Sequence, residues 1–198
     1  MKHLYDLESG DFFDFAGEQF VVLEQREGST FVLLAYNEGL CSFNERDDIK
    51  IKNPNDYTRS ILKELIDKWV EALPRTAAET AAILPFKVDL SCTDRSESYG
   101  DITVKAAPLT IWQQGQFKKL IPQSGNDWYD GYWLVTPRDF RWLDSQNTDN
   151  ARSVWYVAHD GVQYNGFASS YLYGIRPALL LNANFPISSS VKVKVVKK

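Results

Sequence analysis

The chain of 198 residues has few of the residues that build metal or redox centres. It contains two cysteines, Cys41 and Cys92, and two histidines, His3 and His159. The cysteines lie too far apart for a disulfide framework, and neither has a second Cys or His beside it at zinc-ligand spacing. Two histidines cannot supply a three-histidine iron or copper site. We therefore expect no metal and no cofactor, and we expect the thiols to be buried or incidental.

Long hydrophobic runs and segregated charge are also absent. No run approaches the roughly 18 apolar residues of a membrane-spanning helix, and the first residues, from Met1 to Glu8, lack the apolar region of an export signal. Acidic and basic residues are mixed along most of the chain, and the net charge is −4, which disfavours nucleic acid as a partner. These absences predict no membrane insertion and a cytoplasmic or virion-associated protein.

What is present is an ordinary globular composition, with 44% hydrophobic and 24% charged residues. A single domain of this length buries roughly 70% of the surface of its unfolded chain, so it needs no disulfide or metal for stability. The sequence shows no internal repeat and no linker long enough to divide it. We therefore predict one domain over residues 1–198.

Short apolar segments separated by Gly-centred turns fill the first part of the chain. They predict a meander of hairpins with strands at 11–15, 19–24 and 30–36. Further strands are predicted at 86–90, 108–112, 132–135, 154–158, 163–167, 177–181 and 191–196. In the last of these, Val and Lys alternate. This pattern is typical of an edge strand with one buried face, whose lysines disfavour pairing with another chain. Polar loops are predicted at 44–55, 94–101 and 122–127.

One helix is predicted to begin with Asp56 as its N-cap and to end before Pro74. Its apolar residues recur at three- and four-residue steps, at Ile61, Leu62, Leu65, Ile66, Trp69 and Val70. The alanine-rich segment 75–84 predicts a second, shorter helix that ends at Pro85. The pattern as a whole predicts an α+β domain with its helices in the first half.

Several segments together resemble a known family. In the C-terminal third they are Tyr132-Trp133-Leu134-Val135-Thr136-Pro137, Trp155-Tyr156-Val157 followed by Gly161, and Gly174-Ile175-Arg176-Pro177-Ala178-Leu179. Earlier segments are Gly10-Asp11, Phe20–Leu23, Phe31–Leu34 and Arg59–Leu62. The chain resembles the bacterial and phage domain-of-unknown-function family 6273 over nearly its whole length. The resemblance is specific in the last third and looser between Pro74 and Asp127.

This family is similar to the C-type-lectin-like fold, which formylglycine-generating enzymes and the hypervariable proteins of diversity-generating retroelements also use. The resemblance implies small antiparallel sheets, one or two flanking helices, and adjacent N- and C-terminal strands. It does not transfer a function, because one fold hosts many. A formylglycine-generating enzyme would need two cysteines late in the chain, where this sequence has none. The oxygen-rich calcium loops of true lectins also lack a good match here.

The segment from Trp142 to Tyr173 mixes rigid aromatic residues with adaptable polar ones, which is typical of binding surfaces. Part of it must be core, since neighbours in a strand, such as Trp155 and Tyr156, point to opposite faces. We interpret the segment as a surface for a protein or glycan ligand. The candidate ligand-binding residues are Trp142, Asp144, Asn147, Arg152, Trp155, Gln163, Tyr164, Asn165, Tyr171 and Tyr173.

Two other motifs have competing interpretations. His159-Asp160-Gly161 is either an acid/base pair or a hairpin turn, and Asp-Gly between strands favours the turn. Arg176 either binds an anion or satisfies buried carbonyl and carboxylate groups, and its five donors favour the second role.

The sequence therefore predicts a non-catalytic binding module of a phage or mobile-element-associated protein that can form oligomers. One rival is a structural subunit of a larger assembly whose aromatic face is buried against a neighbour. The other rival is a hydrolase that uses only carboxylates, such as Asp127 and Asp130 beside Trp128.

Overall fold

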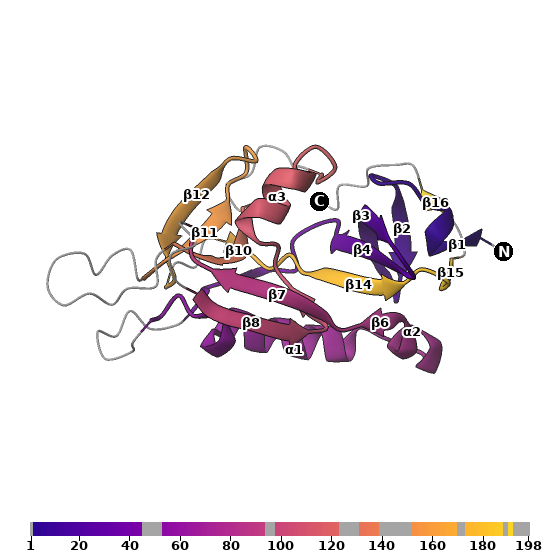
Figure 1. The fold of residues 1–198 in the computed structure, drawn as a ribbon, viewed down its shortest axis with the longest axis horizontal. Coiled ribbons are helices and arrows are strands. Elements are labelled where there is room, and N and C mark those ends of the chain that lie inside the picture. The colour runs from indigo at the N-terminus through magenta and orange to yellow at the C-terminus, as the bar shows by residue number, and fades with distance from the viewer. Residues whose placement is uncertain are drawn as a thin grey trace, which may run out of the picture.

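The computed structural model describes residues 2–44, 53–93, 98–122, 131–138, 152–169, 173–187 and 190–191. These residues form a mixed α+β structure in which small, mostly antiparallel sheets predominate over a few helices (Figure 1). This agrees with the predicted α+β class and its small antiparallel sheets.

The first sheet holds the N-terminal hairpins. Its strands are ordered β16 (Ser190–Val191), β2 (Phe12–Phe15), β3 (Glu18–Arg26), β4 (Ser29–Leu34), β14 (Ala178–Asn182) and β6 (Ile83–Leu84), and β9 (Ala106–Ala107) also pairs with β14. The β2–β3 turn uses Ala16 and Gly17 with φ of 53° and 89°, the positive values that a tight two-residue hairpin requires. The predicted meander is confirmed.

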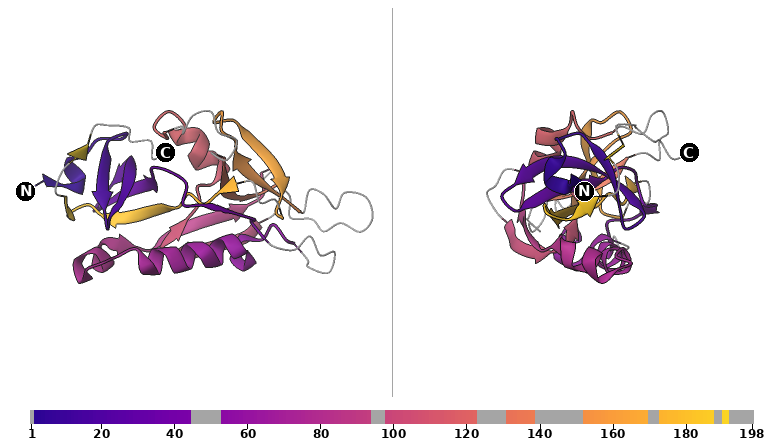
Figure 2. Two further views of the ribbon diagram at one scale, coloured as in Figure 1. Left: turned by 180° about the vertical axis from the view of Figure 1, so that it is seen from behind. Right: turned by 90° about the vertical axis from the view of Figure 1, so that its right-hand side faces the viewer.

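The two ends of the chain meet in this sheet, as predicted. Strand β14 pairs antiparallel with β4, and β16 pairs with β2. Strand β1 (Lys2–His3) pairs with β15 (Pro186–Ile187) and is followed by the short 3-10 helix η1 (Leu4–Asp6). Figure 2 shows these early and late strands gathered at the N-terminal end of the molecule. Of the strand predicted at 191–196, only Val191 lies within the described residues.

The second sheet carries most of the aromatic C-terminal third. Its order is β12 (Gln163–Phe167), β11 (Ser153–Val157), β10 (Tyr132–Pro137), β13 (Tyr173–Gly174) and β5 (Leu40–Cys41). All neighbours are antiparallel except β10 and β13. A separate hairpin of β7 (Phe86–Ser91) and β8 (Ser98–Val104) contacts β10. The predicted strands at 86–90, 132–135, 154–158, 163–167 and 177–181 are confirmed with small shifts at their ends.

The main helix begins later than predicted. Asp56 accepts a hydrogen bond from the Thr58 amide and caps a 3-10 turn, η2 (Tyr57–Arg59). Ser60 then caps α1 (Ile61–Ala72) by accepting from the Lys63 amide at 3.0 Å. The predicted start at Asp56 is therefore wrong for the α-helix, because two successive capping residues divide the segment. Helix α1 runs along one side of the molecule and buries Leu62, Ile66 and Val70 (Figure 2).

The second predicted helix is shorter in the structure. Helix α2 (Ala77–Ala82) starts with a capping box between Thr76 and Glu79. It ends before the predicted 84, because Ile83–Leu84 pair with β14 as β6.

The strand predicted at 108–112 is wrong. Thr110 caps helix α3 (Ile111–Phe117), whose Gln113 side chain accepts from the Thr110 amide at 2.9 Å. This capping box favours a helix where the short apolar run alone permitted either structure. Because α3 follows the midpoint of the chain, the prediction that the helices lie in the first half is also wrong. The loop predicted at 94–101 is wrong from Ser98 onward, where β8 pairs with β7.

The core extends through both sheets and under α1. Its largest fully buried side chains include Trp133, Tyr57, Phe13, Phe20, Phe31 and Phe43. Cys92 is buried and Cys41 is half-buried, and no disulfide joins them. Within the described ranges, no helix combines the length and apolarity needed to cross a membrane.

Candidate functional site

Four aromatic rings form a connected series on one face of the second sheet. Trp133, Tyr156 and Tyr164 lie side by side across β10, β11 and β12, with ring centroids 6.1 Å and 6.0 Å apart. Tyr173 from β13 stacks on Tyr156 at 3.7 Å and meets Trp133 edge-on at 4.7 Å. We call these four residues the aromatic ladder.

The ladder runs from the core to the surface. Trp133 is fully buried, packs edge-on against Phe43, and donates its indole N–H to the Cys41 carbonyl at 2.9 Å. Tyr156 and Tyr173 are half-buried, and Tyr164 is 45% exposed. The exposed ring of Tyr164 is therefore the outer member of a series of packed rings whose inner member, Trp133, is fixed in the core.

Two glycines make room for the stacked tyrosines. A Cβ added to Gly166 would lie 3.1 Å from Tyr156 Cε1, and one added to Gly131 would lie 3.1 Å from Tyr173 Cδ1 and 2.8 Å from the Val157 carbonyl. Burial raises the pKa of Tyr173, and the Tyr156 hydroxyl acts in the same direction. Below the ordinary tyrosine pKa of about 10 the hydroxyl of Tyr173 is therefore neutral.

The structure divides the predicted site residues between two faces of the sheet. Tyr164 and Tyr173 belong to the aromatic ladder, whereas Trp155, Gln163 and Asn165 alternate with it and point to the opposite face. The predicted opposition of Trp155 and Tyr156 is confirmed. The predicted residues Trp142, Asp144, Asn147 and Tyr171 lie outside the described residues.

The side chains on the opposite face have partners within the chain. Gln163 donates to the Ile111 carbonyl at 2.9 Å and to the Gln114 side chain, so it ties β12 to α3. Trp155 donates its indole N–H to the Thr93 hydroxyl. Asn165 accepts from Arg138 at 2.8 Å. These contacts hold the β11–β12 hairpin in place.

Arg152 contributes through its backbone to the same hairpin. Its carbonyl accepts from the Ala168 amide at 2.8 Å and closes the open end of the two strands. Two ladder members were not among the candidate residues of the sequence interpretation, the fully buried Trp133 and the half-buried Tyr156. For Tyr156, its position next to Trp155 in an alternating strand was the available signal.

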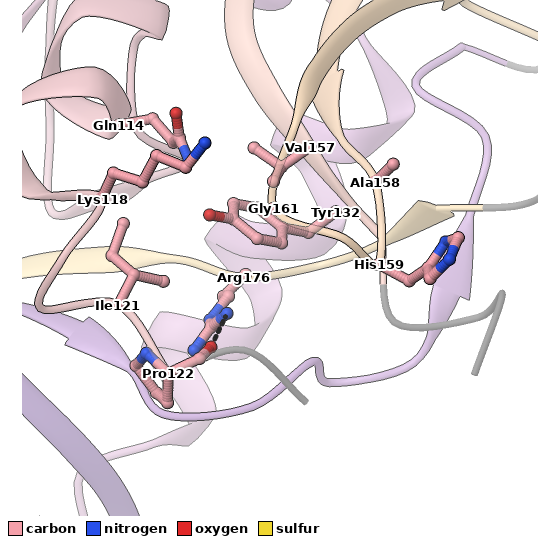
Figure 3. Close-up of a pocket in the computed structure, with 10 residues that line it drawn as sticks. All are labelled: Gln114, Lys118, Ile121, Pro122, Tyr132, Val157, Ala158, His159, Gly161 and Arg176. Carbon is pink, nitrogen blue, oxygen red and sulfur yellow. Dashed lines mark hydrogen bonds between the residues drawn. The ribbon is translucent and has the colours of Figure 1, made fainter. Parts of the chain in front are cut away.

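A small pocket lies between α3 and the β11–β12 turn. Figure 3 shows its lining, which consists of Gln114, Lys118, Ile121, Pro122, Tyr132, Val157, Ala158, His159, Gly161 and Arg176. Its free space of about 10 Å³ is close to what one water molecule needs. Burial raises the pKa of the Tyr132 hydroxyl, while the positive charge of Arg176 acts against this rise. The enclosed space therefore has room for about one water molecule.

Arg176 has the structural role that its sequence context favoured. It is 3% exposed and donates to the carbonyls of Leu34, Ala35 and Pro122 at 2.9, 2.7 and 3.1 Å. Its guanidinium also lies over the Tyr132 ring, 5.0 Å from the centroid. The side chain thus joins the end of β4 to the segments after α3 and β13.

The segment His159-Asp160-Gly161 forms the β11–β12 turn, so the hairpin interpretation is confirmed. Gly161 has φ of 74° and donates to the Ala158 carbonyl at 2.9 Å. Asp160 accepts from the Val162 amide at 2.9 Å, as turn-forming aspartates do.

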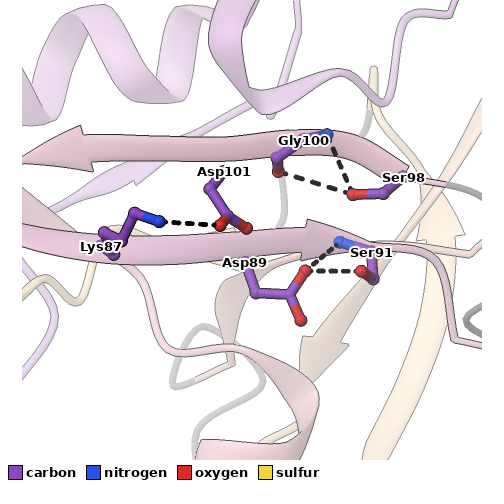
Figure 4. Close-up of polar contacts among 6 residues, drawn as sticks. All are labelled: Lys87, Asp89, Ser91, Ser98, Gly100 and Asp101. Atoms are coloured by element: carbon purple, nitrogen blue, oxygen red, sulfur yellow. Dashed lines mark hydrogen bonds and ion pairs between the residues drawn. The ribbon is translucent and has the colours of Figure 1, made fainter.

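The carboxylates proposed for a hydrolase, Asp127 and Asp130, lie outside the described residues. The β7–β8 hairpin does place Asp89 opposite Asp101 (Figure 4). Asp101 pairs with Lys87 at 3.2 Å, and Asp89 accepts from the Ser91 amide and hydroxyl. All three charged groups are exposed, which is typical of a solvated sheet surface. Across the described parts of the chain, no cluster of three or more His, Cys, Asp or Glu residues is placed to hold a metal ion.

Comparison of the chain with protein-family models, with curated proteins and with solved structures finds no match.

Proposed function

We propose that this chain is a non-catalytic binding module that takes a protein or glycan ligand on the outer end of the aromatic ladder. The observation that carries this proposal is the stack of Tyr156 on Tyr173, which leads outward to Tyr164. Tyrosines bury much area for few rotatable bonds, so a ring already held by a sheet loses little entropy on binding.

The chemistry of this face suits a ligand with a flat apolar surface. The rings offer π faces, and their hydroxyls can donate or accept hydrogen bonds. A sugar ring, or an aromatic or proline side chain, fits such a surface. The proposed contact residues are Tyr156, Tyr164 and Tyr173, joined by the sequence-based candidates Trp142, Asp144, Asn147 and Tyr171. Trp155, Gln163 and Asn165 support the hairpin from the other side, and the Arg152 carbonyl closes its open end.

The proposed kinship with the C-type-lectin-like fold, and with phage or mobile-element proteins, rests on the sequence segments in the last third. The adjacent terminal strands and the small antiparallel sheets are consistent with it. That kinship favours binding by the late part of the chain, but the ladder supports the proposal without it.

A glycan and protein array with three forms of the chain tests this proposal. Tyr164→Ala removes the exposed ring of the ladder, whereas Phe167→Ala removes a ring of the same strand that is equally exposed, at 46%, but points to the opposite face. We expect Tyr164→Ala to weaken binding about tenfold or more, because a lost stacking contact costs about 1.4 kcal/mol. Phe167→Ala should bind like the wild type. Equal binding by all three forms, or no binding by any, contradicts the proposal.

One observation favours the rival role of a structural subunit. Val162, directly before β12, and Tyr164 and Phe167 within it expose 40%, 45% and 46% of their surface, with Tyr164 and Phe167 on opposite faces of the sheet. Exposed apolar side chains concentrated at one edge of a sheet are typical of surfaces that contact another protein.

A further inference from the structure

Strand β12 forms one edge of the second sheet and has no neighbour on its outer side within the described parts of the chain. Figure 1 shows it at the outer margin of the molecule. Proteins usually protect such an edge with charged residues, proline or a bulge. The sequence Gln163-Tyr164-Asn165-Gly166-Phe167 has no charge and no proline, and its register with β11 is unbroken. This edge lacks the usual protection against pairing.

The hydrogen bonds of the hairpin show which backbone groups point outward. Ala158 donates to the Val162 carbonyl, and Ala168 donates to the Arg152 carbonyl. Hydrogen-bonded and non-bonded pairs alternate in an antiparallel ladder, so Tyr164 and Gly166 bond to β11. The N–H and C=O groups of Gln163, Asn165 and Phe167 therefore point away from the sheet. No hydrogen bond from another described strand reaches them.

We propose that β12 pairs antiparallel with β12 of a second copy of this chain, across a two-fold axis at Asn165. In this register Asn165 lies opposite its own counterpart, and Gln163 lies opposite Phe167 of the other copy. The three outward N–H groups of each copy then meet the three outward carbonyls of the other. One register thus satisfies every outward backbone group of both strands.

The side chains fit the same register. Tyr164 lies opposite Gly166 of the other copy in a non-hydrogen-bonded pair, where side chains approach most closely. Gly166 has no Cβ, and the Tyr156 ring already lies against it at 3.1 Å from the place a Cβ would take. The Tyr164 ring of the second copy can lie beside it, so the two aromatic ladders meet across the axis. The paired strands carry no charged side chains of their own, so none of their side chains repel each other by charge.

The expected dimer is weak. A pair of five-residue strands is far smaller than a standard protein interface, so we expect a dissociation constant on the order of 10–100 µM. Sedimentation velocity of the full chain between about 5 and about 500 µM spans the transition.

Three substitutions at Asn165 separate this pairing from other association. Asn165→Ala keeps the backbone and should leave the dimer intact, although the contact with Arg138 is lost. Asn165→Pro removes one outward N–H at an edge position where proline is tolerated, and it should abolish dimerisation. Asn165→Lys places two like charges opposite each other and should raise the dissociation constant at least about tenfold, with partial recovery in 1 M salt, which screens charges beyond about 3 Å.

Far-UV circular dichroism and thermal midpoints of the monomers establish that each variant is folded. A wild type that stays monomeric up to about 500 µM overturns the proposal, since pairing in the expected range is then excluded. So does an Asn165→Pro variant that is folded and dimerises like the wild type, because another surface must then be responsible. These outcomes require no ligand and leave the proposed binding function to its own test.

Discussion

Replacing Arg176 tests whether this arginine, the only buried charged side chain among the described residues of the C-terminal third, has a structural or a ligand-binding role. Its guanidinium joins three backbone carbonyls, those of Leu34, Ala35 and Pro122. Arg176→Met retains much of the side-chain length and removes all donors. Arg176→Lys retains the charge but replaces the planar fork with one nitrogen, which cannot reach the three carbonyls in the same geometry.

The magnitude follows from these contacts. A buried acceptor left without its donor costs about 1–3 kcal/mol, so three carbonyls set an upper limit near 9 kcal/mol. The Met variant no longer buries a charged group, so the folded state is spared the free energy of desolvating the guanidinium, which offsets part of this loss. We expect a net loss of about 3–4 kcal/mol for Arg176→Met and about 2 kcal/mol for Arg176→Lys. At this chain length, 1 kcal/mol lowers Tm by about 2–4 °C, so Arg176→Met should lower it by roughly 10 °C.

Urea unfolding followed by tryptophan fluorescence and circular dichroism measures these losses. Arg138→Met is the matched control, because Arg138 is exposed and its guanidinium donates to the Asn165 side chain at the surface. It should change the free energy of unfolding by less than about 0.5 kcal/mol. A loss below about 1 kcal/mol for Arg176→Met would refute the structural argument. If that variant were stable but lost an anionic ligand, Arg176 would be a binding residue instead.

Three further predictions concern local features. Ser60→Ala removes the cap that accepts from Lys63 and should cost about 1 kcal/mol in urea unfolding, whereas an unchanged midpoint would show that the cap is dispensable. Gly174→Ala would place its Cβ 2.6 Å from Asn37 Cγ, so we expect a loss of about 1–3 kcal/mol, and a crystal structure with Asn37 unmoved would contradict this reasoning. Because burial raises the folded-state pKa of Tyr173 above its ordinary value of 10.0, the folded protein retains this proton longer than the unfolded chain does. Its stabilising contribution is therefore complete below pH 10 and is lost as the pH rises further, so unfolding free energies measured from pH 9 to 11 should fall less in Tyr173→Phe than in the wild type.

Local sequence signals were sufficient for the hairpins and for most strands. Residues 163–167 were predicted as a strand with the same bounds that the structure shows. The Asp160-Gly161 turn was predicted because a tight hairpin needs positive φ, which glycine adopts without strain. Such features depend on neighbours in sequence, and the residues that specify them are adjacent.

The secondary structure was predicted wrongly where two local signals competed, or where pairing with a strand from a distant part of the chain determined the structure. The run from Leu109 to Trp112 suits a strand or a helix, and the capping box of Thr110 and Gln113 was the sequence signal that distinguishes them. Strand β8 has a weak apolar pattern, and its pairing with β7 gives it order. Ile83–Leu84 continue an alanine-rich helical pattern, yet pairing with β14 draws them into the first sheet.

The sequence by itself determined that aromatic and polar residues concentrate in the last third, and that neighbours such as Trp155 and Tyr156 must face opposite sides. Only the tertiary structure decided which side is covered. Contacts from α3 and Thr93 engage the face of Gln163 and Trp155, while Phe43 covers the inner end of the aromatic ladder. The period of a strand is local, but the element that packs on each face comes from a distant part of the chain. That packing left Tyr164 as the exposed end of the ladder.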